Sequence, residues 1–314
     1  MNGIKAIPKR YFSPLLLLLV VILLATMPRY SAPYIVILFI SIFMYVVLAV
    51  SWTTFCGPTG YISLATAAFF GIGVYTSAIL QALPLPLVTL IAGLLCFLLG
   101  LLFGLITLRL RGMYFVIFTF GLSEFFRHTM IWYEINITGT AGRWLPFLSP
   151  VTVYYYMLVI TLITLLTAYI ISRSKWGLAL QSIGQTEEAA AHIGINVNMV
   201  KIITFAITAF FMGAAGAVMA TRWSYIDPRL AFNPFNSFYP VLMSLFGGVG
   251  QFYGPTLGAG IITVLSDMIL VEFPYHNILL LGIIFIVVIL FLPNGLVGLI
   301  RRREKGVAAA RGSP

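Results

Sequence analysis

Residues 86–107 read PLVTLIAGLLCFLLGLLFGLIT, an apolar run without one charged side chain. A helix of about 20 such residues, rising 1.5 Å per residue, crosses the ~30 Å hydrocarbon core of a bilayer. The whole chain of 314 residues is 61% hydrophobic and only 8% charged, which lies outside the range of proteins that fold in water. The sequence therefore predicts an integral membrane protein.

Further apolar runs lie on both sides of this one. We expect about ten spanning helices, at residues 12–28, 34–52, 61–82, 86–107, 113–132, 151–172, 202–221, 236–248, 254–271 and 277–296. The predicted fold class is an all-α, polytopic transmembrane helical bundle that forms a single domain over residues 1–314. The first run also resembles a signal peptide, although Pro28 and Arg29 are poor context for cleavage.

The positions of lysine and arginine predict the orientation, because these residues are retained on the cytoplasmic side of the membrane. With ten spans and a cytoplasmic N-terminus, thirteen of the eighteen fall on that side and both termini are cytoplasmic. These thirteen are Lys5, Lys9, Arg10, Arg109, Arg111, Arg173, Lys175, Lys201, Arg301, Arg302, Arg303, Lys305 and Arg311.

Two segments rich in glycine and proline interrupt the pattern, CGPTGY at 56–61 and FGGVGQFYGP at 246–255. One reading is a pair of interrupted helices or re-entrant turns, which are tolerated in a membrane only where they are buried in protein or line a water-filled cavity. The other reading is two tight turns between ordinary helical hairpins. Composition alone leaves both open.

Several kinds of chemistry have no motif in this chain. No lysine follows a glycine as a P-loop requires, there is no GxSxG elbow, and the three histidines and two cysteines show no metal-ligand spacing. The basic residues lie mostly between apolar runs, which indicates membrane anchoring and not nucleic-acid binding. We therefore expect no catalytic residues, no metal and no cofactor in this chain, and no nucleic-acid partner.

Ionisable residues inside predicted spans are costly and are functional hypotheses by default. Glu124 has Arg127 and His128 at helical spacing, which favours a paired, structural carboxylate. Asp267 has no such local partner. A proton-coupled carrier would use an isolated carboxylate of this kind, so secondary transport stays an alternative.

The longest stretch outside the predicted spans, residues 173–201, contains a short helix with clear ends. Thr186 is a suitable N-cap, Glu187 and Glu188 suit the first turn, alanines follow, and Gly194 suits the left-handed stop. So short a helix is marginal by itself in water and needs contacts that hold it. Those contacts come either from a partner protein or from this chain's own cytoplasmic ends.

This stretch resembles the coupling loop of bacterial ABC importer permeases, through Glu187, Glu188, Ala189, Ala190, Ala191, Gly194 and Ile195. More narrowly, the chain resembles the M-type permease of the branched-chain amino-acid importers from about Leu48 to Val297. Seven motifs carry the resemblance in order: GPTGYISLATAAFFGIGVYTSA (57–78), LRLRGMYFVIFTFGLSE (108–124), TGTAG (138–142), WGLALQSIGQTEEAAAHIGIN (176–196), FAITAFFMGAAGAVMA (205–220), LFGGVGQFYGPTLGAG (245–260) and FLPNGLVGL (291–299).

The resemblance implies a heteromeric importer of the bacterial inner membrane. Its parts are this permease, a second homologous permease, two ATP-binding subunits that hold ATP and Mg, a periplasmic solute-binding protein and the surrounding lipid. Residues 173–201 are then the cytoplasmic coupling segment, and the contact with the ATPase is expected at Thr186, Glu187, Glu188, Ala189, Ala190, Gly194 and Ile195.

The cargo is less sharply indicated than the family. An apolar amino acid suits a path with few charges, and our candidate lining residues are Tyr61, Ser63, Thr66, Thr119, Thr138 and Gly139. Each of them also suits helix packing. Thr66 stands where the family commonly has His or Gln, and Gly142 stands where it commonly has Asn. These departures leave urea, a short amide or another amino acid open as cargo. A membrane scaffold without transport is a third class of function.

Overall fold

The computed structural model describes residues 19–107, 110, 112–140, 142–250, 253–276, 279–284, 286 and 295–296. Five helices in this part of the chain are long and apolar enough to cross a membrane. They are α2 (Pro33–Thr59), α4 (Leu85–Thr107), α6 (Pro150–Arg173), α9 (Val197–Ala220) and α12 (Gly254–Glu272). The predicted all-α, polytopic membrane bundle is confirmed.

Shorter elements lie between these helices. The helical ones are η1 (Met27–Arg29), α3 (Thr66–Ile79), α5 (Met113–Tyr133), η2 (Glu134–Thr138), α7 (Lys175–Gln185), α8 (Glu187–His192), α10 (Pro228–Ala231) and α11 (Phe235–Gly247). Two short strands, β1 (Arg143–Trp144) and β2 (Tyr225–Ile226), pair antiparallel.

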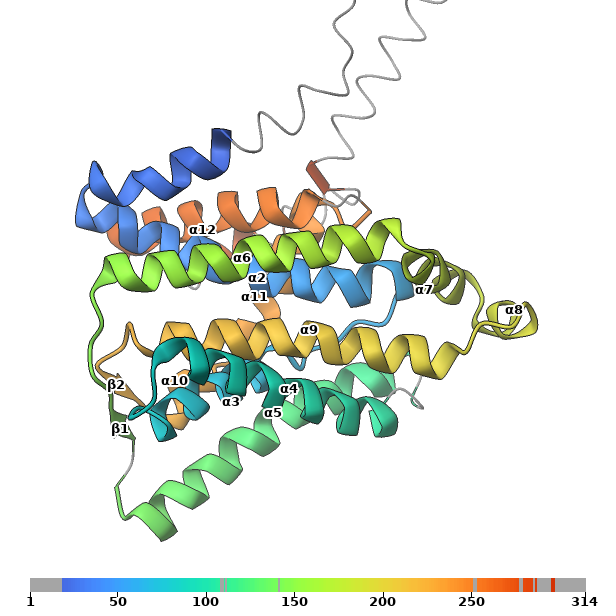
Figure 1. Ribbon diagram of the computed structural model, residues 1–314, viewed down its shortest axis with the longest axis horizontal. Coiled ribbons are helices and arrows are strands. Elements are labelled where there is room, and N and C mark those ends of the chain that lie inside the picture. Colours follow the sequence, from blue (N-terminus) through green and yellow to red (C-terminus); the bar gives the residue numbers. More distant parts are fainter. Residues whose placement is uncertain are drawn as a thin grey trace, which may run out of the picture.

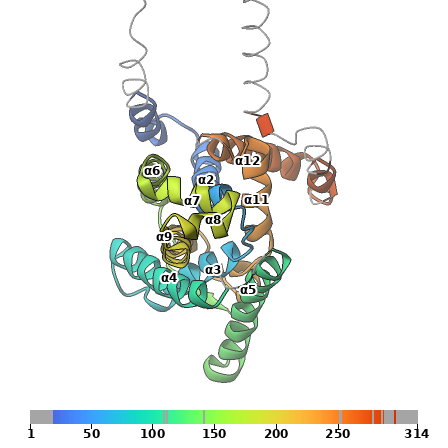
Figure 2. The ribbon, with the colours of Figure 1, turned by 90° about the vertical axis from the view of Figure 1, so that its right-hand side faces the viewer.

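The long helices run between two ends of the molecule (Figure 1). One end carries the β1–β2 ribbon and is called the ribbon end below. At the other end α7 and α8 project beyond the spanning helices, and this is called the α8 end. Figure 2 looks onto the α8 end, where α7 and α8 stand in front of the bundle.

α9 forms the centre of the bundle because it is lined with small residues. A Cβ on Gly73 of α3 would lie 2.0 Å from the carbonyl oxygen of Gly213 on α9, and one on Gly216 would lie 2.1 Å from that of Phe70. On the other side of α9, a Cβ on Gly100 of α4 would lie 2.9 Å from the Cα of Ala206. Small residues of this kind let helix backbones approach closely inside a membrane.

Most predicted spans agree with the observed helices, and the differences have local causes. α9 begins at Val197 and not at 202, because the Asn196 side chain caps it by accepting from the Met199 N–H at 3.1 Å. Of the first predicted span, 12–28, the structure describes the part from 19 onward, which is helical. The tenth, 277–296, lies mostly outside the described residues.

The first glycine–proline segment differs from its prediction. Gly57 and Pro58 lie within the last turn of α2, which ends at Gly60 with a left-handed φ of +72°. The predicted helix start at 61 is wrong, because residues 60–65 form a non-helical segment and α3 begins at Thr66. Ser63 and Ala65 in this segment are buried, so the reading of an interrupted helix applies here.

The second segment is also interrupted, and it meets the first in space. α11 ends at Gly247 and α12 begins at Gly254, and a Cβ on Gly247 would lie 1.8 Å from the Gly254 carbonyl oxygen. A cavity of about 520 Å³ at the α8 end is lined by parts of α2, α6 and α7 and by both glycine–proline segments. The segment residues that line it are Gly57, Pro58, Val249, Gly250 and Pro255.

Candidate functional site

The chain between α6 and α9 folds into two short helices that pack on the rest of the protein. α7 buries Gly177, Leu180 and Ile183 along one face. Leu180 and Ile183 form a small apolar cluster with Ala190 of α8 and Val200 of α9. The connection is therefore a folded element with a fixed place on the bundle.

α8 covers Glu187–His192, close to the range predicted for it. Gly194 ends it as predicted, with a φ of +88°, and the Ile195 N–H donates to the Ala190 carbonyl at 3.1 Å. The predicted N-cap is only partly right, because Thr186 occupies the capping position but its side chain makes no capping hydrogen bond. The first turn is held instead by the side chain of Glu187, which points inward.

α8 has one face against its own chain and one face open. Ala190 is buried, and Ile195 packs partly buried against the same apolar cluster. The open side carries Glu188, Ala189, Ala191, His192 and Ile193, and the Ile193 side chain is 73% exposed. Nearby Leu178 and Met199 are also exposed. A partner protein can therefore reach this surface without any unfolding of the chain.

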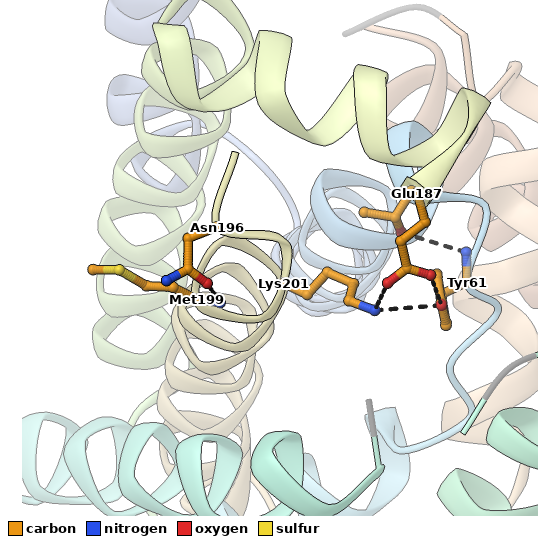
Figure 3. Close-up of polar contacts among 6 residues, drawn as sticks. Tyr61, Glu187, Asn196, Met199 and Lys201 are labelled. Atoms are coloured by element: carbon orange, nitrogen blue, oxygen red, sulfur yellow. Dashed lines mark hydrogen bonds and ion pairs between the residues drawn. The ribbon is translucent and has the colours of Figure 1, made fainter. Parts of the chain in front are cut away.

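The inward side of α8 is tied to two distant segments by one polar cluster (Figure 3). The Tyr61 hydroxyl donates to Glu187 Oε2 at 2.9 Å, and the Lys201 ammonium forms an ion pair with Glu187 Oε1. Lys201 Nζ also lies 3.3 Å from the Tyr61 hydroxyl oxygen and 4.7 Å from the centre of its ring. The cluster joins segment 60–65, α8 and α9.

Lys201 is the most deeply buried member of this cluster, with 1% of its surface exposed. A buried ammonium needs an opposite charge and hydrogen-bond acceptors, because removal of a charge from water is costly. Glu187 supplies the carboxylate, and its side chain is 20% exposed. The electrostatics of the site therefore hold Glu187 against α9.

Segment 60–65 is held in the interior by side chains from three helices. The indole N–H of Trp52 on α2 donates to the Ser63 carbonyl at 2.8 Å. Thr119 of α5 accepts from the Leu64 N–H at 3.0 Å, and Ser237 of α11 donates to the Leu64 carbonyl at 2.7 Å. These bonds satisfy backbone groups that have no helical partner, as a membrane interior requires.

The candidate path residues fall into three groups along the molecule. Ser63, Thr66 and Thr119 lie together in the interior, where all three are buried. Tyr61 lies at the α8 end, against Glu187. Thr138 and Gly139 are exposed, at the end of η2 that leads into the β1–β2 ribbon.

Two buried charged residues were missed by reasoning from the sequence. Lys201 was predicted only as a cytoplasmic charge. Glu134 is 1% exposed near the ribbon end, accepts from the Tyr75 hydroxyl at 3.0 Å, and accepts from the Gly142 N–H at 2.8 Å. Neither has a partner at helical spacing, so no local signal in the sequence marks them.

The two intramembrane carboxylates considered from the sequence both have partners. Glu124 pairs with Arg127 at 2.5 Å, which agrees with the structural reading. Asp267 accepts a hydrogen bond from the Tyr34 hydroxyl of α2. Asp267 lines a cavity of about 170 Å³ together with Ser41 and other residues of α2, α11 and α12.

Comparison with known proteins agrees with this architecture. A family model described as branched-chain amino acid transport system / permease component matches residues 34–290. The high-affinity branched-chain amino acid transport system permease protein LivM of Escherichia coli is 26% identical over 303 residues, which cover 83% of this chain and 69% of LivM.

Sugar permeases match over shorter stretches. The fructose import permease protein FrcC of Rhizobium meliloti is 28% identical over 141 residues, covering 43% of this chain and 39% of FrcC. The ribose import permease protein RbsC of Haemophilus influenzae is 31% identical over 103 residues, covering 32% of each chain. No solved structure matches the chain. Because the family match extends over most of the sequence, the chain belongs to the family of branched-chain amino acid transport system permease components.

Proposed function

We propose that this protein is the permease subunit of an ABC importer that carries branched-chain amino acids across a bacterial inner membrane. It works with a second homologous permease, two ATP-binding subunits that hold ATP and Mg, and a periplasmic solute-binding protein. The single observation that carries the proposal is α8, a short helix that is fixed to the bundle on one face and open on the other.

The shape of α8 supports contact with a separate ATPase. Its six residues span about 9 Å, too short a helix to be stable alone in water. Ala189 and Ala191 on the open side are small, so a partner can approach the helix backbone closely. Ile193 and Met199 add exposed apolar surface beside it. Apolar side chains exposed outside the spanning helices are typical of a docking surface.

The α8 end is cytoplasmic in this proposal, because Arg173 and Lys175 are exposed there at the end of α6. The ribbon end then faces the periplasm and the solute-binding protein. Both chain termini follow as cytoplasmic from the ten-span count.

The proposed path runs between the two ends through the buried group Ser63, Thr66 and Thr119. Thr138 and Gly139 lie at its periplasmic side and Tyr61 lies at its cytoplasmic side. The Thr66 hydroxyl is buried without a hydrogen-bond partner within the described residues, so it is available to a passing solute. The ammonium and carboxylate of an amino acid can be met by such hydroxyls and by free backbone groups.

The proposal that the cargo is a branched-chain amino acid rests on the similarity to LivM. Two alternative functions remain. A urea or short-amide importer would use the same architecture with a different binding protein. A proton-coupled carrier requires a titrating carboxylate in the membrane, and this alternative loses support because both Glu124 and Asp267 have partners.

The docking of the ATPase is tested by a bulky substitution on the open side of α8. Ala189→Trp places a large side chain where the partner approaches and leaves the buried face intact. We expect it to abolish co-purification of co-expressed ATP-binding subunits and ATP-dependent uptake of labelled leucine. Leu166→Trp is the matched control, because Leu166 is exposed on α6, away from α8. Normal uptake and co-purification in Ala189→Trp would exclude docking at this surface.

A further inference from the structure

Tyr61 contacts three separate elements through different parts of its side chain. Its hydroxyl donates to Glu187 of α8, and its ring lies under the ammonium of Lys201 on α9. The ring also packs edge-on against Phe115 of α5, with 5.4 Å between the ring centres. One side chain therefore touches the short helix and also the helix that helps to hold segment 60–65.

Two routes lead from Tyr61 into the interior. The direct route is the contact between Tyr61 and Phe115, whose ring is fully buried. The second runs along the backbone for three residues to Leu64, whose N–H and carbonyl bond to Thr119 and Ser237. Packed and hydrogen-bonded atoms thus connect Tyr61 to α5 and α11.

Because Lys201 is buried, separating it from Glu187 is costly, and this favours α8 and α9 staying in contact when α8 moves. If α8 moved away alone, Lys201 would lose the carboxylate of Glu187 in a place that water does not reach, which is energetically costly. A displacement of α8 is therefore less costly if Tyr61 and Lys201 move with Glu187. Packed contacts of this kind transmit small displacements between two discrete arrangements.

We propose that Tyr61 and Lys201 are positioning residues that transmit the displacement of α8 to segment 60–65, and through it to α5 and α11. This inference rests on the proposed function, in which ATP-binding subunits move α8. The cluster of Tyr61, Glu187 and Lys201 is then the mechanical link between the ATPase contact and the buried group of Ser63, Thr66 and Thr119.

Distances between spin labels test this link without knowledge of the cargo. Labels are placed at exposed positions in the complete importer: Gln185 at the end of α7 next to α8, Tyr114 on α5 and Leu166 on α6 as the reference. In the otherwise unchanged importer we expect ATP to change both the 185–166 and the 114–166 distance. With Tyr61→Phe, which keeps the ring and loses the hydroxyl, the 185–166 change should persist and the 114–166 change should be smaller.

The outcomes separate the two proposals. If ATP leaves the 185–166 distance unchanged in the unsubstituted importer, α8 is not driven and the proposed function fails. If ATP moves α8 and the 114–166 distance still changes normally in Tyr61→Phe, the transmission role is excluded. Tyr154→Phe is the matched control, because this buried tyrosine also loses one hydrogen bond, 2.6 Å to the Leu24 carbonyl, and should behave as the unsubstituted protein.

Transport gives a second readout that a purely structural role would not change. In vesicles with labelled leucine and the binding protein, the ratio of solute moved to ATP hydrolysed should fall in Tyr61→Phe, because the hydroxyl bond that joins Tyr61 to Glu187 is lost while ATP hydrolysis continues. The same ratio should be unchanged in Tyr154→Phe. An unchanged ratio in Tyr61→Phe would contradict the proposal.

Reversing the charges of Glu187 and Lys201 provides a second test if the importer that carries Tyr61→Phe does not assemble. Glu187→Lys and Lys201→Glu each place two like charges together and should abolish the ATP-induced change at position 114. The double variant restores an opposite pair and should restore that change at least in part. Equal loss in the double variant and in the two single variants would overturn the role of this pair.

Discussion

The carbonyl oxygen of Pro58 lies directly against Gly184, so that a Cβ added to Gly184 would come within 1.9 Å of it. Pro58 is in the last turn of α2 and Gly184 is in α7, so this contact fixes α7 against the end of a spanning helix. Only a residue without a side chain fits there.

Gly184→Ala should therefore displace α7 and destabilise the α8 end. Overpacking against backbone costs about 1–3 kcal/mol, because neither helix can yield locally. We expect a lower thermal unfolding temperature of the purified chain in detergent. Gly121→Ala is the control, because a Cβ there meets nothing within 4 Å and alanine favours a helix. Equal unfolding temperatures for the two variants would contradict the close packing of α7 on α2.

Substitutions of Gly194 test the importance of its left-handed backbone conformation, because an added Cβ there would contact no other atom. Its φ is +88° and no atom lies within 4 Å of an added Cβ, so the cost of Gly194→Ala is backbone strain of about 1–2 kcal/mol. Asparagine tolerates the left-handed region better, so Gly194→Asn should be milder than Gly194→Ala. Hydrogen exchange of the α8 amides measures the fraying of the helix end. Slower or equal exchange in Gly194→Ala would show that the left-handed stop is unimportant.

Removal of Glu187 should lower the stability of the protein more than removal of its ion-pair partner Lys201 does. Glu187→Ala leaves a buried ammonium without this carboxylate, which costs about 3 kcal/mol or more. Lys201→Met leaves a carboxylate that is already 20% exposed and can gain water, so the loss should be smaller. Thermal unfolding of both variants measures the difference. The opposite order would mean that Lys201 reaches water when Glu187 is removed.

These tests concern contacts that the sequence did not reveal, although it predicted much of the frame. Apolar runs of the right length marked α4 and α6 closely, and the first-turn acids and Gly194 marked α8. Residues 61–65 fall inside the predicted span 61–82 because apolar residues follow GPTG, and this part of the prediction is wrong. Side chains of Trp52, Thr119 and Ser237 override that local preference, and Thr119 and Ser237 come from remote parts of the chain.

The cluster at α8 could not be predicted for the same reason. Glu187 and Lys201 are 14 residues apart, and Tyr61 is 140 residues from Lys201. On one continuous helix, residues 14 apart would lie about 21 Å from each other, so only the packing of α2, α8 and α9 brings them together. The sequence marked Tyr61 and Glu187 separately, one for the path and one for the ATPase contact, and the structure shows that they touch.

A substitution at Asp267 distinguishes an ATP-driven importer from a proton-coupled carrier. Its carboxylate accepts from the Tyr34 hydroxyl, and an asparagine oxygen can accept the same bond. Asp267→Asn should therefore leave ATP-dependent uptake within about threefold of normal, because one neutral hydrogen bond replaces a charge-assisted one. A protonophore should also have no effect in vesicles supplied with ATP. Complete loss of uptake in Asp267→Asn, together with abolition by the protonophore, would favour a carrier driven by protons. Tyr34→Phe is the companion variant, because it removes the hydrogen bond that Asp267→Asn retains. If this bond serves only to join α12 to α2, Tyr34→Phe should lower thermal stability more than Asp267→Asn does and should leave uptake equally intact.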